Sequence, residues 1–460
     1  MTTPPYDQTA PREAAAPPRC PVAHAPARGP RPVYGPEAEA QPYAFYEQLR
    51  AEHGAVAPVL LYGGVPAWLV LGYQEALEVL RSPLYSSDSR NWHAFREGTL
   101  PADSPLLPIT AWQPLVALTE GAEHARLREA VTESLERVNR HRMRRYLTRY
   151  ATRLIDDFAP TGRADLVADF SRKLPALVIG QLFGMREEDA LPAGAAVADM
   201  ISGGPSAAQS NQVIVDMMRD LVELKRRQPG DDLASWLLVH PAGLTDEEVR
   251  EHLRLALVAA LEPTTNLVAS ALRMVLTDGR FRGHLSGGQM TLPDALEQVL
   301  WDHPPLAVVP TRWAKADTHL GGARIAAGDM VMLGLAAGNV DPAIRSDLTE
   351  PMWGNRSHLA FGAGAHECPG QDLGRAIAEA GVDLLLERLP DVRLAVGEDD
   401  LQVVGTWMSR RLTGLPVRFT PQQGRQAPAA AAPPTAAPQV RHEAAPVREE
   451  RRRWGWFRRR

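Results

Sequence analysis

The chain has 460 residues, of which 45% are hydrophobic and 23% are charged, as is ordinary for a soluble globular protein with a large core. Its formal net charge of −5 argues against general nucleic-acid affinity, and its two cysteines exclude a disulfide framework. We find no apolar run long enough to span a membrane and no basic-then-apolar N-terminus, so neither a spanning helix nor a secretory signal is expected. A reducing cytoplasm fits this composition.

The ends of the chain differ in composition from its middle. Residues 1–33 are rich in proline and alanine without any period, which predicts a disordered arm that includes Cys20. Residues 34–420 carry periodic patterns and predict one folded domain, and residues 421–447 are again rich in proline and alanine and predict a linker.

A basic aromatic tail, residues 448–460, ends the chain. It sets seven arginines against two glutamates and interleaves them with two tryptophans and a phenylalanine. This composition suits an anionic membrane surface or an acidic protein partner, whereas nucleic acid is a weaker fit to the overall charge. A solvated tail without a partner is the alternative. The expected location is therefore cytoplasmic, with peripheral membrane association as an option.

The first part of the domain shows helical and strand-like patterns. We predict a helix over 42–52, strands over 56–61 and 67–71 around a Gly63-Gly64 turn, and a helix over 73–81. Residues 84–120 carry few periodic signals and several prolines. Their apolar side chains either line a pocket or pack the loop down; these are Trp92, Phe95, Leu107 and Trp112.

His124 and Arg128 lie four residues apart on a helix predicted to run towards Val138, so they share one helical face. Two donors on one face can clamp a carboxylate. The more common role of such a pair is a solvated helix surface.

A long apolar helix is predicted from Val249 to Leu276, and Thr245 with Glu248 forms a capping box at its start. Being apolar nearly all round, this helix should be buried. An acid, a helix breaker and a hydroxyl stand in its middle as Glu262, Pro263 and Thr264. Pro263 predicts a kink, and a buried carboxylate is costly enough to need a functional or structural reason.

Near the C-terminal third, one cysteine lies in a glycine-rich turn directly before a helix predicted over 371–388. A thiolate there would face free N–H groups at a helix N-terminus, and glycines allow close approach to a flat partner. One strong axial bond to haem iron suits this arrangement. The stretch is Phe361-Gly362-Ala363-Gly364-Ala365-His366-Glu367-Cys368-Pro369-Gly370.

This stretch resembles the haem-binding loop of the cytochrome P-450 superfamily, the haem-thiolate monooxygenases, at all six of its fixed positions. These positions are Phe361, Gly362, Gly364, His366, Cys368 and Gly370. The resemblance implies a mainly α fold with a smaller β portion, the cytochrome P-450 fold. It implies haem b as cofactor, with Cys368 as the metal ligand.

The resemblance also implies roles for residues elsewhere in the chain. The haem propionates would be bound by His124, Arg128, Arg312 and His366. Glu262 matches the acid of the family's distal proton relay, whereas Pro263 stands where the alcohol commonly sits. Thr264, one residue later, is the expected substitute unless the relay differs.

One part of the chain departs from the family pattern. The family's most characteristic helix carries a Glu and, three residues later, an Arg; here the register set by Pro304-Pro305 places Gln298 and Trp301 there. A small actinobacterial subset of the superfamily looks like this. Buried ion pairs are often replaceable by packed neutral groups, so the fold can survive the change.

Two functions follow from these observations. The first is a monooxygenase that inserts one oxygen atom of O2 into an unidentified small organic substrate, with electrons from a ferredoxin and a ferredoxin reductase. The second is a haem-bearing regulatory or scaffold protein in a membrane-associated complex, suggested by the altered charged pair and the basic tail.

Overall fold

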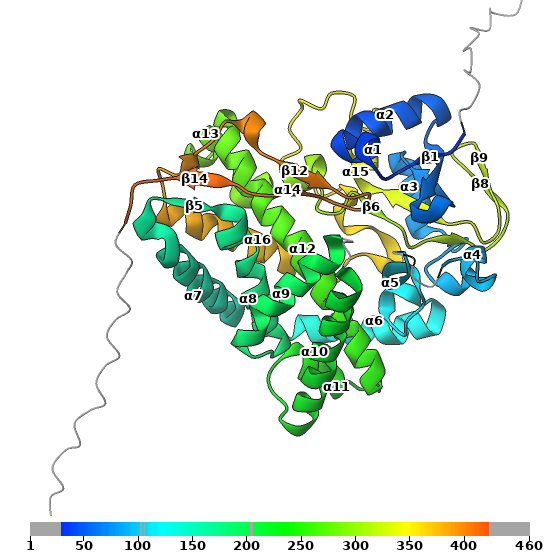
Figure 1. Ribbon diagram of the computed structural model, residues 1–460, viewed down its shortest axis with the longest axis horizontal. Coiled ribbons are helices and arrows are strands. Elements are labelled where there is room, and N and C mark those ends of the chain that lie inside the picture. Colours follow the sequence, from blue (N-terminus) through cyan, green and yellow to red (C-terminus); the bar gives the residue numbers. More distant parts are fainter. Residues whose placement is uncertain (1–28, 102–103, 105, 203–205, 423–460) are drawn as a thin grey trace, which may run out of the picture. The chain divides into compact units, whose positions relative to one another are not determined.

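The computed structural model describes residues 29–101, 104, 106–202 and 206–422 (Figure 1). The basic aromatic tail, nearly all of the predicted linker and most of the N-terminal arm, with Cys20, lie outside these residues. Arg31 and Pro32 already pair with a strand, so regular structure begins three residues before the domain boundary predicted at residue 34.

Helices dominate the described part of the chain, in agreement with the predicted fold class. The α-helices are α1 Pro36–Ala40, α2 Pro42–His53, α3 Tyr73–Arg81, α4 His93–Arg96, α5 Leu107–Thr110, α6 Gly121–Glu136, α7 Arg140–Phe158, α8 Lys173–Phe183, α9 Glu187–Ser202, α10 Ala207–Arg227, α11 Leu233–Leu238, α12 Asp246–Thr277, α13 Gly279–Ser286, α14 Leu292–Asp302, α15 Leu335–Asn339 and α16 Gln371–Arg388. Single helical turns are η1 Tyr62–Gly64, η2 Ser89–Asn91, η3 Val116–Leu118, η4 Ala159–Thr161, η5 Val167–Ser171, η6 Leu359–Phe361, η7 Gly364–His366 and η8 Glu398–Asp400.

The strands form a smaller β portion. They are β1 Arg31–Pro32, β2 Val56–Leu61, β3 Val65–Val70, β4 Tyr85–Ser86, β5 Arg163–Asp165, β6 Val308–Val309, β7 Trp313–Ala314, β8 Thr318–Leu320, β9 Ala323–Ile325, β10 Val331–Gly334, β11 Arg393–Leu394, β12 Val403–Gly405, β13 Arg410–Leu412 and β14 Pro416–Arg418. The main sheet has the order β1-β2-β3-β10-β6. Its β2–β3 hairpin pairs Val56 with Val70 through the predicted turn, where Gly63 and Gly64 both have positive φ.

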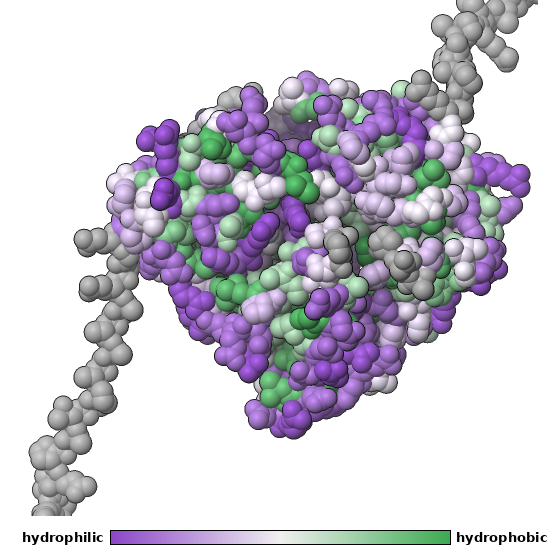
Figure 2. Space-filling model, in the orientation of Figure 1, coloured by the Kyte–Doolittle hydropathy of each residue, from purple (hydrophilic) through white to green (hydrophobic). Residues whose placement is uncertain are grey.

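α12 is the central helix of the helical half and contacts α8, α10, α14 and α16 (Figure 1). Its N-terminus has the predicted capping box of Thr245 and Glu248, and the helix continues through Pro263. By length and apolar composition α12 could cross a membrane, but 61% of its most apolar window is buried among other helices. On the face drawn in Figure 2, hydrophobic residues are scattered among hydrophilic ones. α12 is thus a core helix.

Two large apolar clusters meet along one side of α12. The helical cluster includes residues of α7, α8, α12 and α16, and the sheet-side cluster includes residues of β2, β3 and the segment after η2. Leu255 packs against both clusters. One and two turns later Ala259 is exposed and Pro263 is half-buried, although α12 is otherwise mostly buried. Leu255, Ala259 and Pro263 thus form a partly uncovered stripe on α12.

The cysteine loop runs from η6 to the start of α16 and depends on its glycines. Gly362 and Gly364 have φ of 69° and 74°, a backbone conformation that L side chains rarely adopt. A Cβ on Gly364 would lie 2.6 Å from the Leu80 carbonyl oxygen of α3. A Cβ on Gly370 would meet no protein atom within 4 Å. The loop therefore requires glycine at position 364, both because of its positive φ and because of its close approach to the Leu80 carbonyl oxygen.

We predict that Gly364→Ala lowers the free energy of unfolding by about 2 kcal/mol or more, because it combines a strained φ with a backbone clash. Gly370→Ala is the matched control and should change it by less than about 0.5 kcal/mol. Urea unfolding of both variants provides the measurement. Equal stability of the two would show that contact with α3 does not constrain the loop.

Candidate active site

Cys368 lies half-buried in the loop that joins η7 to α16. Its backbone N–H donates to the Phe361 carbonyl oxygen at 2.9 Å, which closes the loop on itself. Burial raises the pKa of the Cys368 thiol, opposed by the Gly370 N–H and by the positive charges of Arg128 and Arg375. A thiolate here gains most from a cation bound directly to the sulfur.

The four residues predicted to bind propionates gather beside this loop from three parts of the chain. His124 and Arg128 lie on α6, Arg312 directly precedes β7, and His366 ends η7. The His124 and His366 rings lie 4.1 Å apart between centroids. Arg128 Nη1 also donates to the Glu367 carbonyl oxygen at 2.6 Å and so ties α6 to the cysteine loop.

These side chains carry positive charge or donor groups, and within the part of the chain that the structure describes they form no ion pair with a carboxylate. Arg312 is 5% exposed, and the hydrogen bonds of its guanidinium within the described residues go to Thr311. Burial lowers the pKa of Arg312 to about 10. Nε2 of His124 is buried without a hydrogen-bond partner in the described part of the chain. Buried donors left like this are costly, so the cluster is built for an anionic group.

The electrostatics of the two histidines agree with this reading. Burial together with Arg312, His124 and Arg128 lowers the pKa of His366 to about 3, and burial with Arg128 and Arg312 lowers that of His124. The carboxylate of Glu120 opposes the pKa shift of His124, but it accepts from the Ser87 N–H at 3.1 Å and lies 3.7 Å from Lys315. The residues present therefore fit a group with two carboxylates, as haem has.

The two residues predicted for proton delivery face different neighbours. Glu262 is buried, and its Oε1 lies 3.5 Å from Nη1 of Arg411 on β13 and 3.4 Å from Nδ2 of Asn266. The Thr264 hydroxyl lies 3.8 Å from where a Cβ on Gly374 of α16 would stand. Residues two apart on a continuous helix do not share a face. The structure does not bring Glu262 and Thr264 together, and the role of Thr264 stays a prediction.

The segment that covers the predicted pocket is mainly packed down. Trp92 is fully buried, with its ring centroid 6.3 Å from that of Trp313, so it belongs to the core rather than to a pocket wall. Trp112 is partly buried, and the Arg90 guanidinium lies 4.4 Å from its ring centroid.

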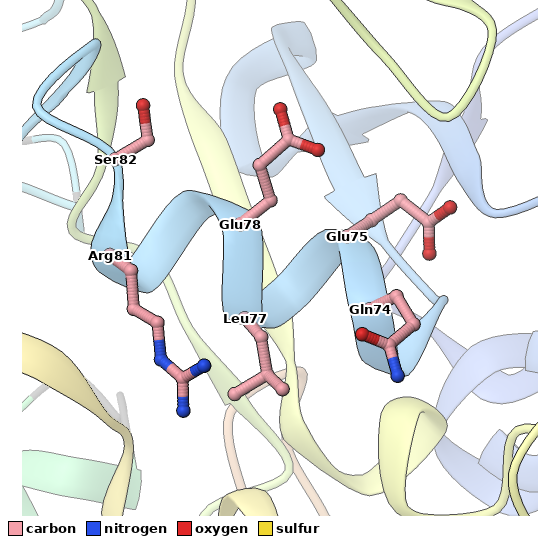
Figure 3. A pocket seen from close by; sticks show the side chains of 6 residues that line it. All are labelled: Gln74, Glu75, Leu77, Glu78, Arg81 and Ser82. Carbon is pink, nitrogen blue, oxygen red and sulfur yellow. The ribbon is translucent and has the colours of Figure 1, made fainter.

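An open surface cavity of about 490 Å³ lies along α3 (Figure 3). It is lined by Gln74, Glu75, Leu77, Glu78, Arg81 and Ser82. In Figure 3 the Glu78 and Arg81 side chains leave the helix in opposite directions. None of the predicted site residues lines this cavity, so it is not the active site.

The helix that departs from the family pattern is neutral at the two predicted positions, Gln298 and Trp301. A buried glutamate, Glu297, nevertheless precedes them and contacts His358 and Arg375. Neither His358 nor Arg375 belongs to the site residues predicted from the sequence. Arg375 could have been found from its position one turn inside the helix that follows the cysteine, whereas no local signal marks His358.

Comparison with known proteins places these features in one family. No family model matches the chain. It is 32% identical over 408 residues to the cytochrome P450 monooxygenase PikC of Streptomyces venezuelae, covering 85% of this chain and 94% of that one. It is 31% identical over 381 residues to 2-hydroxy-5-methyl-1-naphthoate 7-hydroxylase of Streptomyces carzinostaticus, covering 80% and 93%.

Solved structures agree with these sequence relatives. CYP154C4 from Streptomyces sp. W2061 superposes with a TM-score of 0.76 at 28% identity, over 81% of this chain and 94% of that one. CYP154A1 from Streptomyces coelicolor A3(2) gives a TM-score of 0.74 at 28% identity, over 82% and 97%. The predicted fold is confirmed.

We predict that Arg312→Met speeds transfer of haem from the holoprotein to excess apomyoglobin by about 10- to 100-fold, because it removes charge-assisted hydrogen bonds to a propionate. The control is Arg345→Met, which removes a buried arginine whose Nη1 already has a partner, Asp302, at 2.7 Å. Arg345→Met should lower the melting temperature with little change in haem transfer. Unchanged transfer from Arg312→Met would remove Arg312 from the haem site.

Proposed function

Because this chain belongs to the cytochrome P450 superfamily, and is thus a monooxygenase with haem on a cysteine thiolate, we propose that Cys368 holds a haem b that oxygenates a small organic substrate. In this reaction one atom of O2 enters the substrate and the other leaves as water, with two electrons and two protons consumed. The cluster of His124, Arg128, Arg312 and His366 beside Cys368, which forms no ion pair with a carboxylate among the described residues, is the observation that carries the proposal.

The cysteine loop and the four propionate-binding residues would each hold a different part of the cofactor. Cys368 would supply the axial thiolate, while the four donors would neutralise the propionates and set the orientation of the ring. A haem ligated by a thiolate supplies the redox chemistry that cleaves O2. The protein itself would hold this ligand, exclude water from the side of the haem away from Cys368 and deliver protons.

The opposite wall is α12. Its partly uncovered stripe of Leu255, Ala259 and Pro263 carries no polar side chain, which favours an apolar part of the substrate near this wall. Glu262 lies beside the stripe, and we assign it the delivery of protons because, among the described residues, its carboxylate is held by long contacts of 3.4 and 3.5 Å. Release from Arg411 would let it exchange protons with water in the pocket.

Electrons would come from a ferredoxin reduced by a ferredoxin reductase. The cysteine loop reaches the protein surface, where Gly364, Ala365 and Pro369 are exposed. A carrier docked there would lie close to Cys368. The names of the relatives describe hydroxylases and monooxygenases, and no comparison favours the regulatory or scaffold alternative.

The decisive experiment is turnover of the holoprotein with ferredoxin, ferredoxin reductase, NADPH and 18O2 on a broad compound panel. We expect at least one product that carries a single 18O atom, and a reduced CO complex with the red-shifted band of thiolate ligation. Cys368→Ala should lose both. Absence of any oxygenated product, or Cys368→Ala with the parent's optical bands, would overturn the assignment.

The same assay tests the acid. Glu262→Gln should keep the red-shifted band and turn over about 100-fold more slowly, the usual scale of general acid–base catalysis. Glu248→Gln is the matched control, since Glu248 is also a buried glutamate of α12 paired with an arginine, Arg126, at the far end of the helix. Equal turnover of the two variants would remove Glu262 from proton delivery.

We further propose a cytoplasmic protein that associates with anionic membrane through residues 448–460. Their net five positive charges contribute about 1 kcal/mol each at an anionic surface, and the three aromatic residues favour its interface. An acidic protein partner is the alternative.

Deletion of residues 448–460 should lower partitioning onto phosphatidylserine vesicles by about 100-fold or more, in line with the charge removed. Co-sedimentation measures the effect, and vesicles of phosphatidylcholine alone are the control because they lack the anionic charge. The CO spectrum of the truncated protein should match the parent's. Equal sedimentation of both proteins would exclude the membrane role.

A further inference from the structure

A buried carboxylate stands between the cysteine loop and two helices. Glu297 of α14 is 2% exposed. Its Oε1 accepts from Nε of Arg375 at 2.7 Å, and its Oε2 accepts from Nη2 of the same guanidinium at 3.2 Å. Oε2 also lies 2.8 Å from Nε2 of His358. This bidentate pair with a third contact joins α14 to α16 and to the residue that precedes η6.

The hydrogen bond at Nδ1 of His358 shows which ring nitrogen carries the proton. Nδ1 accepts the backbone N–H of Ala360 at 3.2 Å, so the ring proton lies on Nε2 and is donated to Glu297. His358 is therefore neutral, and the buried charges that compensate each other are those of Glu297 and Arg375. Arg356, a largely exposed residue, adds a longer contact of 3.6 Å.

From Arg375 the contacts continue to both sides of the cysteine. Its guanidinium lies 4.4 Å from the centroid of the Phe361 ring, and Phe361 accepts the Cys368 N–H. Its Nη1 donates to Oε1 of Gln371 at 3.0 Å, and Nε2 of Gln371 donates to Oε1 of Glu367 at 2.8 Å. Glu367 is the residue before Cys368.

The neutral positions next to Glu297 serve another segment. Oε1 of Gln298 accepts from the Met352 N–H at 2.6 Å, and Nε1 of Trp301 donates to the Asn355 carbonyl oxygen at 2.8 Å. Gln298 and Trp301 therefore hold the chain before the cysteine loop without charge. The charged contact towards the cysteine loop is made instead by Glu297, the residue before Gln298, through Arg375.

We propose that Glu297 is a positioning residue for the thiolate ligand: paired with Arg375 and His358, it holds Phe361 and Glu367 so that Cys368 keeps the geometry of the axial bond. This inference rests on the proposed haem-thiolate function. It also assigns to the Glu297–Arg375 pair the buried charge that Gln298 and Trp301 lack.

The electrostatics are consistent with a carboxylate at position 297. Burial acts to raise the pKa of Glu297, but hydrogen bonds from His358 and Arg375 and the charge of Arg375 outweigh it and lower the pKa. Removing the negative charge would leave the Arg375 guanidinium buried and unpaired, which is far more damaging than losing both partners. The guanidinium would then turn away from Phe361 and Gln371.

The test is the reduced CO spectrum and its stability over time in holoprotein carrying Glu297→Gln. We expect the red-shifted thiolate band to convert to the band of a neutral thiol about tenfold faster than in the parent, or more. Glu297→Asp, which keeps the charge, should restore part of the lifetime. The reduction potential of the haem iron gives a second readout that a merely structural role would not move.

Glu248→Gln is the control, because it removes another buried glutamate from an ion pair, that with Arg126, at the N-terminal end of α12. It should lower the melting temperature and leave band lifetime and potential unchanged. If Glu297→Gln does not fold, the double variant Glu297→Gln with Arg375→Gln removes both charges, and we expect it to fold with the shortened band lifetime. Parental lifetime and potential in Glu297→Gln, or in the double variant, would overturn the inference. Absence of the red-shifted band in the parent would instead refute the proposed function.

Discussion

Uncompensated positive charge beside a cysteine is the constraint on which this structure depends. Arg312 and His124 are buried and His366 is half-buried, and in the described part of the chain the Arg312 guanidinium forms no ion pair with a carboxylate. Folding must place these groups together at a cost in desolvation and repulsion. A protein selected for stability alone would not assemble them. Their convergence is explained by an anionic cofactor that recovers the cost when it binds.

Elements from different parts of the fold bring the cysteine loop and these donors together. The cysteine loop continues directly into α16, and it also contacts α3, where Gly364 approaches the Leu80 carbonyl oxygen. The cations arrive from α6 and from the chain before β7, which belong to different parts of the fold. α12 is a mostly buried helix with a partly uncovered apolar stripe at Leu255, Ala259 and Pro263.

In α14 the buried charge lies on Glu297, one residue before the neutral Gln298. Gln298 and Trp301 make neutral hydrogen bonds to the segment around residues 352–355, while Glu297 carries the ionic contact to α16. A buried ion pair is seldom a net source of stability, but it does specify geometry when both partners are fully bonded. Here the geometry specified is that of the loop that holds the thiolate.

Sequence alone determined the cysteine loop, the capping box of the long helix and the β2–β3 hairpin, and it predicted the four donors that gather beside that loop. These features are local, or are recognised through a motif whose spacing is short, so neighbouring residues suffice to define them. Only the tertiary structure decided that Glu297 pairs with Arg375, 78 residues away, and Glu262 with Arg411, 149 residues away. It also buried Trp92 in the core. Such contacts depend on which faces of distant helices and strands meet, and periodicity within one segment carries no information about its partner.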